Sequence, residues 1–218
     1  MAKIMDSLGR PIMHSLDGLP IHVRQLADMF RGHGQRQVRN KNGVNDVDRF
    51  DDGVITTREG NTKATHFDPE TGRPITERGT ITEDFGSSTR GDNATDIGNL
   101  GESTDDGGHL GGHRFYGDTP DEGIAPQAAN LNRGAWKKME NEWADWVSRG
   151  FRVDYSIDVT PPGAIRPDSF EVEYTVTNPT TNEVVHRNWP EFENVSGQTF
   201  NRVSRADMPT TESPGGAP

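Results

Sequence analysis

The side chains best suited to chemistry are concentrated between Asp105 and Asn132. Glycines interrupt this segment and permit close backbone approach to a ligand. The segment also offers two imidazoles, several carboxylates and three amides, namely His109, His113, Gln127, Asn130 and Asn132. This combination of proton acceptors and oxygen donors could support hydrolysis assisted by a metal ion.

Four interpretations of this segment are open from the residues alone. The H-x3-H spacing of His109 and His113 fits two ligands of a zinc site. The aspartates and glycines fit one imperfect copy of a calcium-binding glycine-rich repeat. The segment also fits a turn-rich loop whose histidines make ordinary hydrogen bonds. The fourth interpretation is a nuclease site with one histidine and one magnesium ion.

Glu140 follows Asn132 by eight residues. On a helix of ~3.6 residues per turn, this spacing separates two side chains by roughly 80° around the axis. Both residues could therefore reach the same side of a hydrated metal ion.

Three sequence motifs resemble one family. They are DGGHL at residues 106–110, IAPQAANLNRGAWKKMENEW at 124–143 and RPDSF at 166–170. Together they resemble the DNA/RNA non-specific endonucleases, in particular the branch found as C-terminal toxin domains of bacterial polymorphic toxins. The resemblance extends from about Thr62 to Met208.

The resemblance implies an α+β fold with a ββα-metal finger and a small antiparallel sheet packed on one main helix. It implies that His109 is the general base and that Asn132 is a metal ligand. Glu140 corresponds to the acidic residue that orients metal-bound water, so it belongs to both the catalytic and the metal group. The implied cofactor is Mg2+, with Mn2+ as an alternative.

The chain departs from the family pattern at two glycines. Gly107 stands where many members have a phosphate-contacting arginine, and Gly123 stands where some have a second asparagine near the metal. The candidates to supply the missing positive charge are Arg90, Arg114 and Arg133. The supporting residues are Asp106, interpreted as a turn-stabilising carboxylate rather than a ligand, Gln127 and Asn130.

The elements that must position this site are predicted mainly after Gly134. Apolar residues at helical spacing predict a helix over 135–149, with its tryptophans in the core and Gly150 ending it. Alternation predicts strands at 151–159 and 170–176 that pair antiparallel and cover the tryptophan face, and a third extended piece at 183–187.

Earlier segments carry weaker signals. Residues 1–60 are predicted to be weakly ordered with a short helix within 21–30, residues 61–208 to form the nuclease domain, and residues 209–218 to be a disordered tail. A turn is expected at Asp68–Gly72, followed by extended chain, and 89–111 should be mainly loop with a short extended piece near its end. The basic run Arg31–Lys41 fits either a solvated linker or an arm that contacts a polyanion.

Composition limits the possible functions. The 218 residues contain 34 acidic and 23 basic side chains and are only 30% hydrophobic, which predicts a modest core. Between Glu83 and Glu122 there are ten acids and two bases, a balance opposite to that of most nucleic-acid binders. The absence of cysteine excludes disulfides, thiolate zinc sites and a cysteine nucleophile.

The expected function is a Mg2+-dependent, sequence-non-specific endonuclease acting on DNA and RNA. The toxin branch implies secretion or injection by a specialised bacterial system, action in the target-cell cytoplasm, and a cognate immunity protein with a basic surface. No ordinary signal peptide and no membrane span are expected from the sequence. The alternative is a catalytically inactive nuclease-like module that binds a protein.

Overall fold

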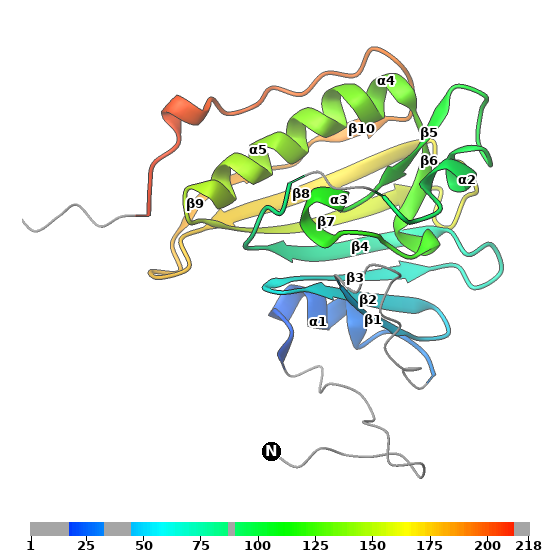
Figure 1. Cartoon of the computed structure of the whole chain (residues 1–218), viewed down its shortest axis with the longest axis horizontal. Coiled ribbons are helices and arrows are strands. Elements are labelled where there is room, and N and C mark those ends of the chain that lie inside the picture. Colours follow the sequence, from blue (N-terminus) through cyan, green and yellow to red (C-terminus); the bar gives the residue numbers. More distant parts are fainter. Residues whose placement is uncertain (1–17, 33–44, 87–89, 212–218) are drawn as a thin grey trace, which may run out of the picture.

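A large antiparallel sheet forms the centre of the molecule (Figure 1). The computed structural model describes residues 18–32, 45–86 and 90–211. The strands of this sheet are β1 (Asp46–Arg49), β2 (Gly53–Arg58), β3 (Asn61–Phe67), β4 (Pro74–Ile81), β7 (Arg152–Thr160), β8 (Ser169–Thr177), β9 (Val184–Asn188) and β10 (Glu191–Glu193). Their order is β1-β2-β3-β4-β7-β8-β10, and β9 also pairs with β8. The α+β class is confirmed, but the sheet has eight strands and is larger than predicted.

The predicted central strand pair is confirmed. Strands β7 and β8 are antiparallel, with Tyr155 opposite Tyr174. Along β7 the side chains alternate between buried and more accessible positions, as expected for a sheet with one face covered. Strand β9 corresponds to the predicted third extended piece, whereas β10 was not predicted.

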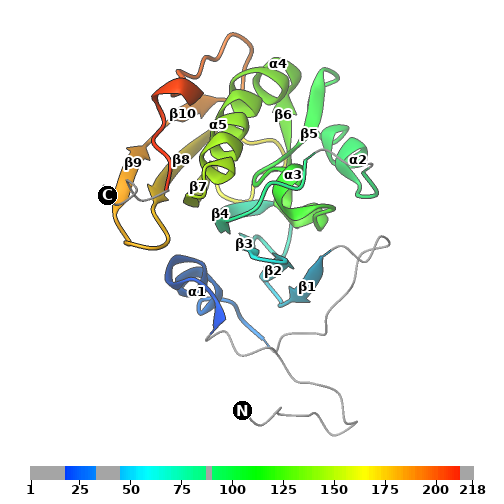
Figure 2. The same ribbon diagram turned by 60° about the vertical axis from the view of Figure 1, so that its left-hand side comes forward.

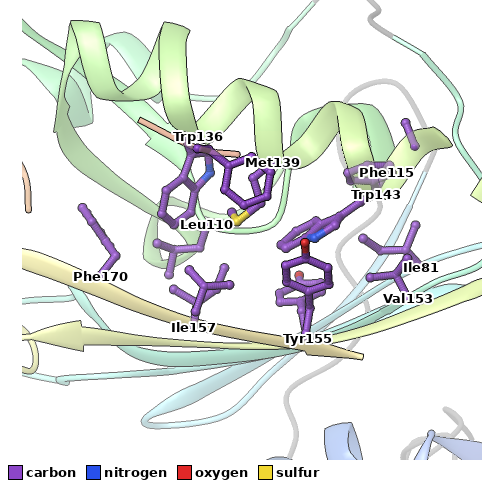
Figure 3. Close-up of a cluster of buried hydrophobic side chains, with 14 of the residues drawn as sticks. Ile81, Leu110, Phe115, Trp136, Met139, Trp143, Val153, Tyr155, Ile157 and Phe170 are labelled. Carbon is purple, nitrogen blue, oxygen red and sulfur yellow. The ribbon is translucent and has the colours of Figure 1, made fainter. Parts of the chain in front are cut away.

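The main helical segment lies across the sheet face formed by β7 and β8 (Figures 1 and 3). It comprises α4 (Ala129–Leu131), a π-helical turn (Asn132–Trp136) and α5 (Lys137–Ser148). The three tryptophans are at most 3% exposed, which confirms their prediction as core residues. The helical segment begins six residues before the predicted start, and Gly150, at a φ of 86°, follows its end as expected.

A two-stranded unit precedes this helix and completes a ββα arrangement. Strands β5 (Asp105–His109) and β6 (Ile124–Ala128) pair antiparallel, with His109 opposite Ile124. The short elements α3 (His113–Tyr116) and η2 (Asp121–Gly123) lie in the connection between the two strands. The ββα finger predicted from the sequence is therefore present.

Helix α2 (Ala94–Gly98) packs against β5 and was not predicted. The segment 89–111 was expected to be mainly loop. A small apolar cluster formed by Ala94, Ile97 and Ile124 joins α2 to the finger. Five residues with two apolar side chains are too short for a periodic signal, so this helix depends on its tertiary contacts.

A helix lies on the sheet face opposite α5 (Figure 2), and a second apolar cluster lies between this helix and the sheet. Helix α1 (Ile21–Ala27) packs there against β3 and β4, which confirms the predicted short helix. Ala64 of β3 faces α1, while its neighbour Lys63 faces Tyr116 on the other side, because successive strand residues alternate.

The predicted weak order of residues 1–60 is wrong for their described part. Strands β1 and β2 pair with each other, and β2 pairs with β3, so the boundary predicted at residue 61 lies inside the sheet. Because β1 (DVDR) and β2 (GVITTR) contain many polar residues, neither shows the alternation of apolar residues that predicts a strand. The basic run 33–41 and the tail residues 212–218 lie outside the described residues.

The turn between β3 and β4 is confirmed. The Asp68 carboxylate accepts backbone hydrogen bonds from Glu70 and Thr71, and Gly72 adopts a φ of 67°. The extended chain predicted after it is β4.

Candidate functional site

A cavity of about 400 Å³ opens between the finger, the main helix and α2. His109 lines it from the end of β5, Asn132 from the π-helical turn and Glu140 from α5. These three residues were predicted to act together, and the structure places all of them around one cavity. The π-helical turn is notable because such turns often occur at functional sites.

His109 lies at the inner wall of the cavity and is 5% exposed. Its Nε2 lies 2.7 Å from Oδ2 of Asp92. Burial lowers the pKa of His109, although the Asp92 carboxylate opposes this shift. The imidazole is therefore kept neutral and able to accept a proton at neutral pH.

Asp106 on β5 holds the side chains of Asn132 and Arg133, which lie in the π-helical turn after β6. Its Oδ2 accepts a hydrogen bond of 3.0 Å from Nδ2 of Asn132, and both carboxylate oxygens accept bonds from Arg133. Because the amide nitrogen of Asn132 is engaged, its carbonyl oxygen remains available to a ligand. Asp106 thus orients an amide and an arginine, rather than a turn as predicted.

Glu140 occupies a confined position beside Gly112, the residue that precedes the short helix α3. A Cβ atom at Gly112 would lie 2.6 Å from its Oε1, so the absence of a side chain there allows the carboxylate to fit. Burial raises the pKa of Glu140 to about 7, although nearby cations led by Arg114 oppose the shift. Because burial disfavours the charged form of Glu140, a positive ligand bound beside it would stabilise the ionised carboxylate.

Four cationic residues line the cavity, and they differ in how they are held. Arg114 donates to Asp84 and Asn141, and Arg133 donates to Asp106. Arg90 is exposed and makes no ion pair with another described residue, although its charge acts on Asp106, His109 and Glu140. The fourth, Lys137, was not predicted. Arg90 is therefore the arginine most available to an incoming phosphate.

Two predicted supporting residues lie outside the cavity lining. Gln127 is fully buried beside Gly108, and its amide has no hydrogen-bond partner among the described residues. Asn130 accepts a bond from the backbone N–H of Gly197 and is positioned at the surface. Neither side chain lines the cavity that holds His109, Asn132 and Glu140, so the structure gives neither a direct part in the chemistry.

The glycine at position 107 has a structural explanation. A Cβ atom there would lie 1.7 Å from the carbonyl oxygen of Ala94, because α2 crosses the strand at this point. A side chain at 107 is therefore incompatible with α2. The segment immediately before α2 carries Arg90, which lines the cavity, and Asp92, which contacts His109.

A second histidine–aspartate pair adjoins the first. Nε2 of His113 lies 3.0 Å from Oδ1 of Asp118. The rings of His109 and His113 meet edge to face, with their centroids 5.5 Å apart. Asp92 and Asp118 were not predicted as site residues; each lies in a connecting segment, Asp92 before its partner His109 and Asp118 after its partner His113. The only sequence signal for them was the excess of acidic residues between positions 83 and 122, which does not single out Asp92 or Asp118.

The zinc interpretation of His109 and His113 is not supported by this arrangement, because each Nε2 is paired with a different aspartate. One group of carboxylates and imidazole among the described residues, Asp92, His113 and Asp118, has ligand atoms within 4.8 Å of one another. Oxygens of both carboxylates in this group already accept hydrogen bonds.

Residues 81–178 match the family model of the DNA/RNA non-specific endonucleases. The chain is therefore similar to the DNA/RNA non-specific endonucleases over these residues, and it is a hydrolytic nuclease by class. Within the described residues, no helix has the length and apolar character needed to cross a membrane.

Among solved structures, the chain is similar to NucA from Streptococcus agalactiae. It is 14% identical to the form with magnesium ion bound, over 73% of this chain and 86% of that chain, at a TM-score of 0.48. The form with no metal bound is 13% identical, over 84% of this chain and 93% of that chain, at a TM-score of 0.46.

The residues of the cavity fit a hard divalent cation. The available amide oxygen of Asn132 and the confined carboxylate of Glu140 are oxygen donors of the kind that Mg2+ and Mn2+ prefer. The two residues also line the same cavity as His109.

Proposed function

We propose that this protein is a Mg2+-dependent endonuclease that hydrolyses phosphodiester bonds of DNA and RNA without sequence preference. The observation that supports this most directly is the placement of His109, Asn132 and Glu140 around one cavity. Mn2+ would have the same ligand preference.

In the proposed mechanism, Asn132 and Glu140 hold the metal ion, Asn132 through its amide oxygen. A bound Mg2+ supplies stabilisation of the negative charge that develops on the phosphate and on the leaving 3′ oxygen. His109 accepts a proton from the attacking water, a role that contributes roughly 10²- to 10⁴-fold to the rate.

Arg90, Arg133 and Arg114 bind the substrate backbone in this proposal. Contacts to phosphates position a nucleic acid but carry no sequence information. Because the charged side chains that line the cavity are suited to phosphate and the attacking group is water, neither the base sequence nor the 2′-hydroxyl is required.

The test is cleavage of supercoiled plasmid and of a folded RNA, with Mg2+, with EDTA, and with Mg2+ restored. We expect Mg2+-dependent cleavage of both. His109→Ala and Asn132→Ala should each reduce the rate by about 10²-fold or more. His66→Ala is the matched control, because His66 lies on β3 away from the cavity and should leave the rate unchanged. Equal cleavage by wild type and His109→Ala would refute the assignment.

We also propose that the nuclease is an antibacterial toxin that is secreted or injected and acts in the cytoplasm of the target cell. The motifs DDGGHL and RPDSF support this proposal. Expression inside a bacterium should arrest growth and degrade nucleic acid, whereas His109→Ala should be tolerated. Tolerance of the active wild-type enzyme would contradict the toxin role.

The proposed immunity protein should present a basic surface to the acidic segment 83–122. Such a complex should form more slowly as salt increases. Binding of the adjacent gene's product, measured at several salt concentrations, tests this expectation, and a salt-independent association rate would contradict it.

A further inference from the structure

The carboxylate of Asp92 is buried against the imidazole of His109. The two side chains are 3% and 4% exposed, and Oδ2 of Asp92 lies 2.7 Å from Nε2 of His109. The same oxygen accepts a bond of 3.3 Å from the backbone N–H of Thr119. Two donors therefore converge on one carboxylate oxygen.

The protonation of this pair determines the imidazole tautomer. Burial by itself would raise the pKa of Asp92, but the hydrogen bond and charge of His109, together with the Thr119 N–H, lower it to about 2. An ionised carboxylate only accepts hydrogen bonds, so Nε2 of His109 carries the hydrogen. The lone pair of the neutral ring is then on Nδ1, which has no hydrogen-bond partner in the described part of the chain.

The backbone around Asp92 is fixed by close packing. Helix α2 begins two residues later and lies so close to β5 that Gly107 cannot carry a side chain. Asp118, one residue before Thr119, accepts a bond of 2.8 Å from the backbone N–H of Gly91. Asp92 is thus fixed by the hydrogen bond of Gly91 before it, by helix α2 after it, and by the bond from Thr119 to its carboxylate.

We propose that Asp92 is a positioning residue that holds His109 as the Nε2–H tautomer, with Nδ1 available to the cavity as the proton acceptor. This inference rests on the proposed role of His109 as general base. The competing assignment is a shared metal ion at Asp92, His113 and Asp118, whose ligand atoms lie within 4.8 Å of one another.

Two substitutions separate the charge of Asp92 from its hydrogen bond. In Asp92→Asn the amide oxygen can replace Oδ2 as acceptor, with the NH2 group in the place of Oδ1, which has no partner among the described residues. Asp92→Ala removes both the charge and the acceptor. Asp96→Asn is the matched control, since Asp96 is an exposed acid on α2.

We expect Asp92→Ala to lower kcat by about 10²-fold or more with little change in KM, because orientation of the base is lost. Asp92→Asn should fall between Ala and wild type. Wild-type kcat in Asp92→Ala would overturn the inference. In that case the nuclease proposal would still hold as long as wild type cleaves and His109→Ala does not. Failure of the Asp92 inference is therefore distinguishable from failure of the nuclease proposal.

The pH–rate profile distinguishes positioning from a merely structural role. The charged or titratable groups around His109 are Asp92, Lys63, Arg90 and His113. Loss of the Asp92 charge removes an interaction that raises the pKa of His109, so the acidic limb should move to lower pH in Asp92→Asn but not in Asp96→Asn. An unmoved limb in Asp92→Asn would refute the proposal.

The tautomer can also be measured in the wild-type protein, independently of activity or of the folding of any variant. Two-bond ¹H–¹⁵N NMR spectra at neutral pH should show His109 as the Nε2–H form. A predominant Nδ1–H form would overturn the inference. The inference would also fail if the wild-type protein bound two Mn2+ ions and Asp92→Asn bound only one, because Asp92 would then be a metal ligand.

Discussion

At the scale of single residues, two carboxyl groups of the site have opposite pKa shifts. That of Asp92 is lowered to about 2 and that of Glu140 is raised to about 7. Burial raises the pKa of both groups. At Asp92 the interactions with His109 and the backbone N–H of Thr119 outweigh burial, whereas at Glu140 the nearby cations do not. Such divergence is typical of sites in which neighbouring acids have different roles.

The lowered pKa of Asp92 predicts a dependence of stability on acidity. Because the folded pKa lies below the unfolded value of 3.8, the ionised group contributes stability above about pH 4, and this contribution is lost as pH falls towards 2. We expect Asp92→Asn to lower the free energy of unfolding by about 2 kcal/mol at pH 6. The difference from wild type should shrink towards pH 2.5 in urea titrations. A constant difference across this range would contradict the assigned pKa.

At the scale of elements, the site depends on how α2 and the finger are joined to the sheet. Helix α2 approaches β5 closely enough to exclude a side chain at Gly107. On the other side, Arg166 in the β7–β8 connection donates to Asp105 at the start of β5. The finger is thus held between a short helix and a sheet loop.

Gly107→Ala should destabilise the protein, because its Cβ would meet the backbone carbonyl of Ala94. Such overpacking costs typically ~1–3 kcal/mol. Gly134→Ala is the control on the main helix, where a Cβ meets nothing within 4 Å, and it should be neutral or stabilising by about 0.5–1 kcal/mol. Chemical denaturation measures both. An unaffected Gly107→Ala variant would show that α2 does not pack as described.

Arg166→Ala should destabilise the protein by about 3 kcal/mol, because it leaves the fully buried Asp105 carboxylate without its cation. Arg166→Lys should recover only part of this loss, since an ammonium group lacks the planar fork. Adding Asp105→Asn to Arg166→Ala should restore stability, because the unpaired charge is removed. If the double variant is no more stable than the single one, the ion pair is not the cause.

At the scale of the whole molecule, the net charge of -11 contrasts with the cations at the cavity. A polyanionic substrate is repelled by much of the surface and attracted locally. Binding should therefore be strongly salt-dependent, because cavity cations displace counterions from the nucleic acid.

We expect log KM for duplex DNA to rise linearly with log salt concentration. Arg90→Ala should reduce that slope by about one unit, as expected for loss of one phosphate contact. Arg187→Ala on β9 is the control with the same change of charge at an exposed position outside the cavity lining, and its slope should match wild type. An unchanged slope in Arg90→Ala would exclude a phosphate contact there.

The sequence by itself determined the local parts of the protein. Alternating apolar residues predicted β7 and β8, and the tryptophan spacing predicted most of α5, because these patterns record which face of an element is buried. The motifs around His109 and Asn132 also indicated the nuclease class, which the family match confirms. Each of these signals lies within a short stretch of chain.

Tertiary structure alone decided which distant groups meet. Asp92 precedes His109 by 17 residues, and nothing in the intervening sequence indicates that α2 crosses β5. The π-helical turn at Asn132 widens the helix, so the angle expected from regular α-helical spacing does not apply to Glu140. Strands β1 and β2 escaped detection because the pairing of β1 with β2 and of β2 with β3 orders them despite many polar residues. Periodicity records burial along one element, whereas these contacts arise only when separate elements pack together.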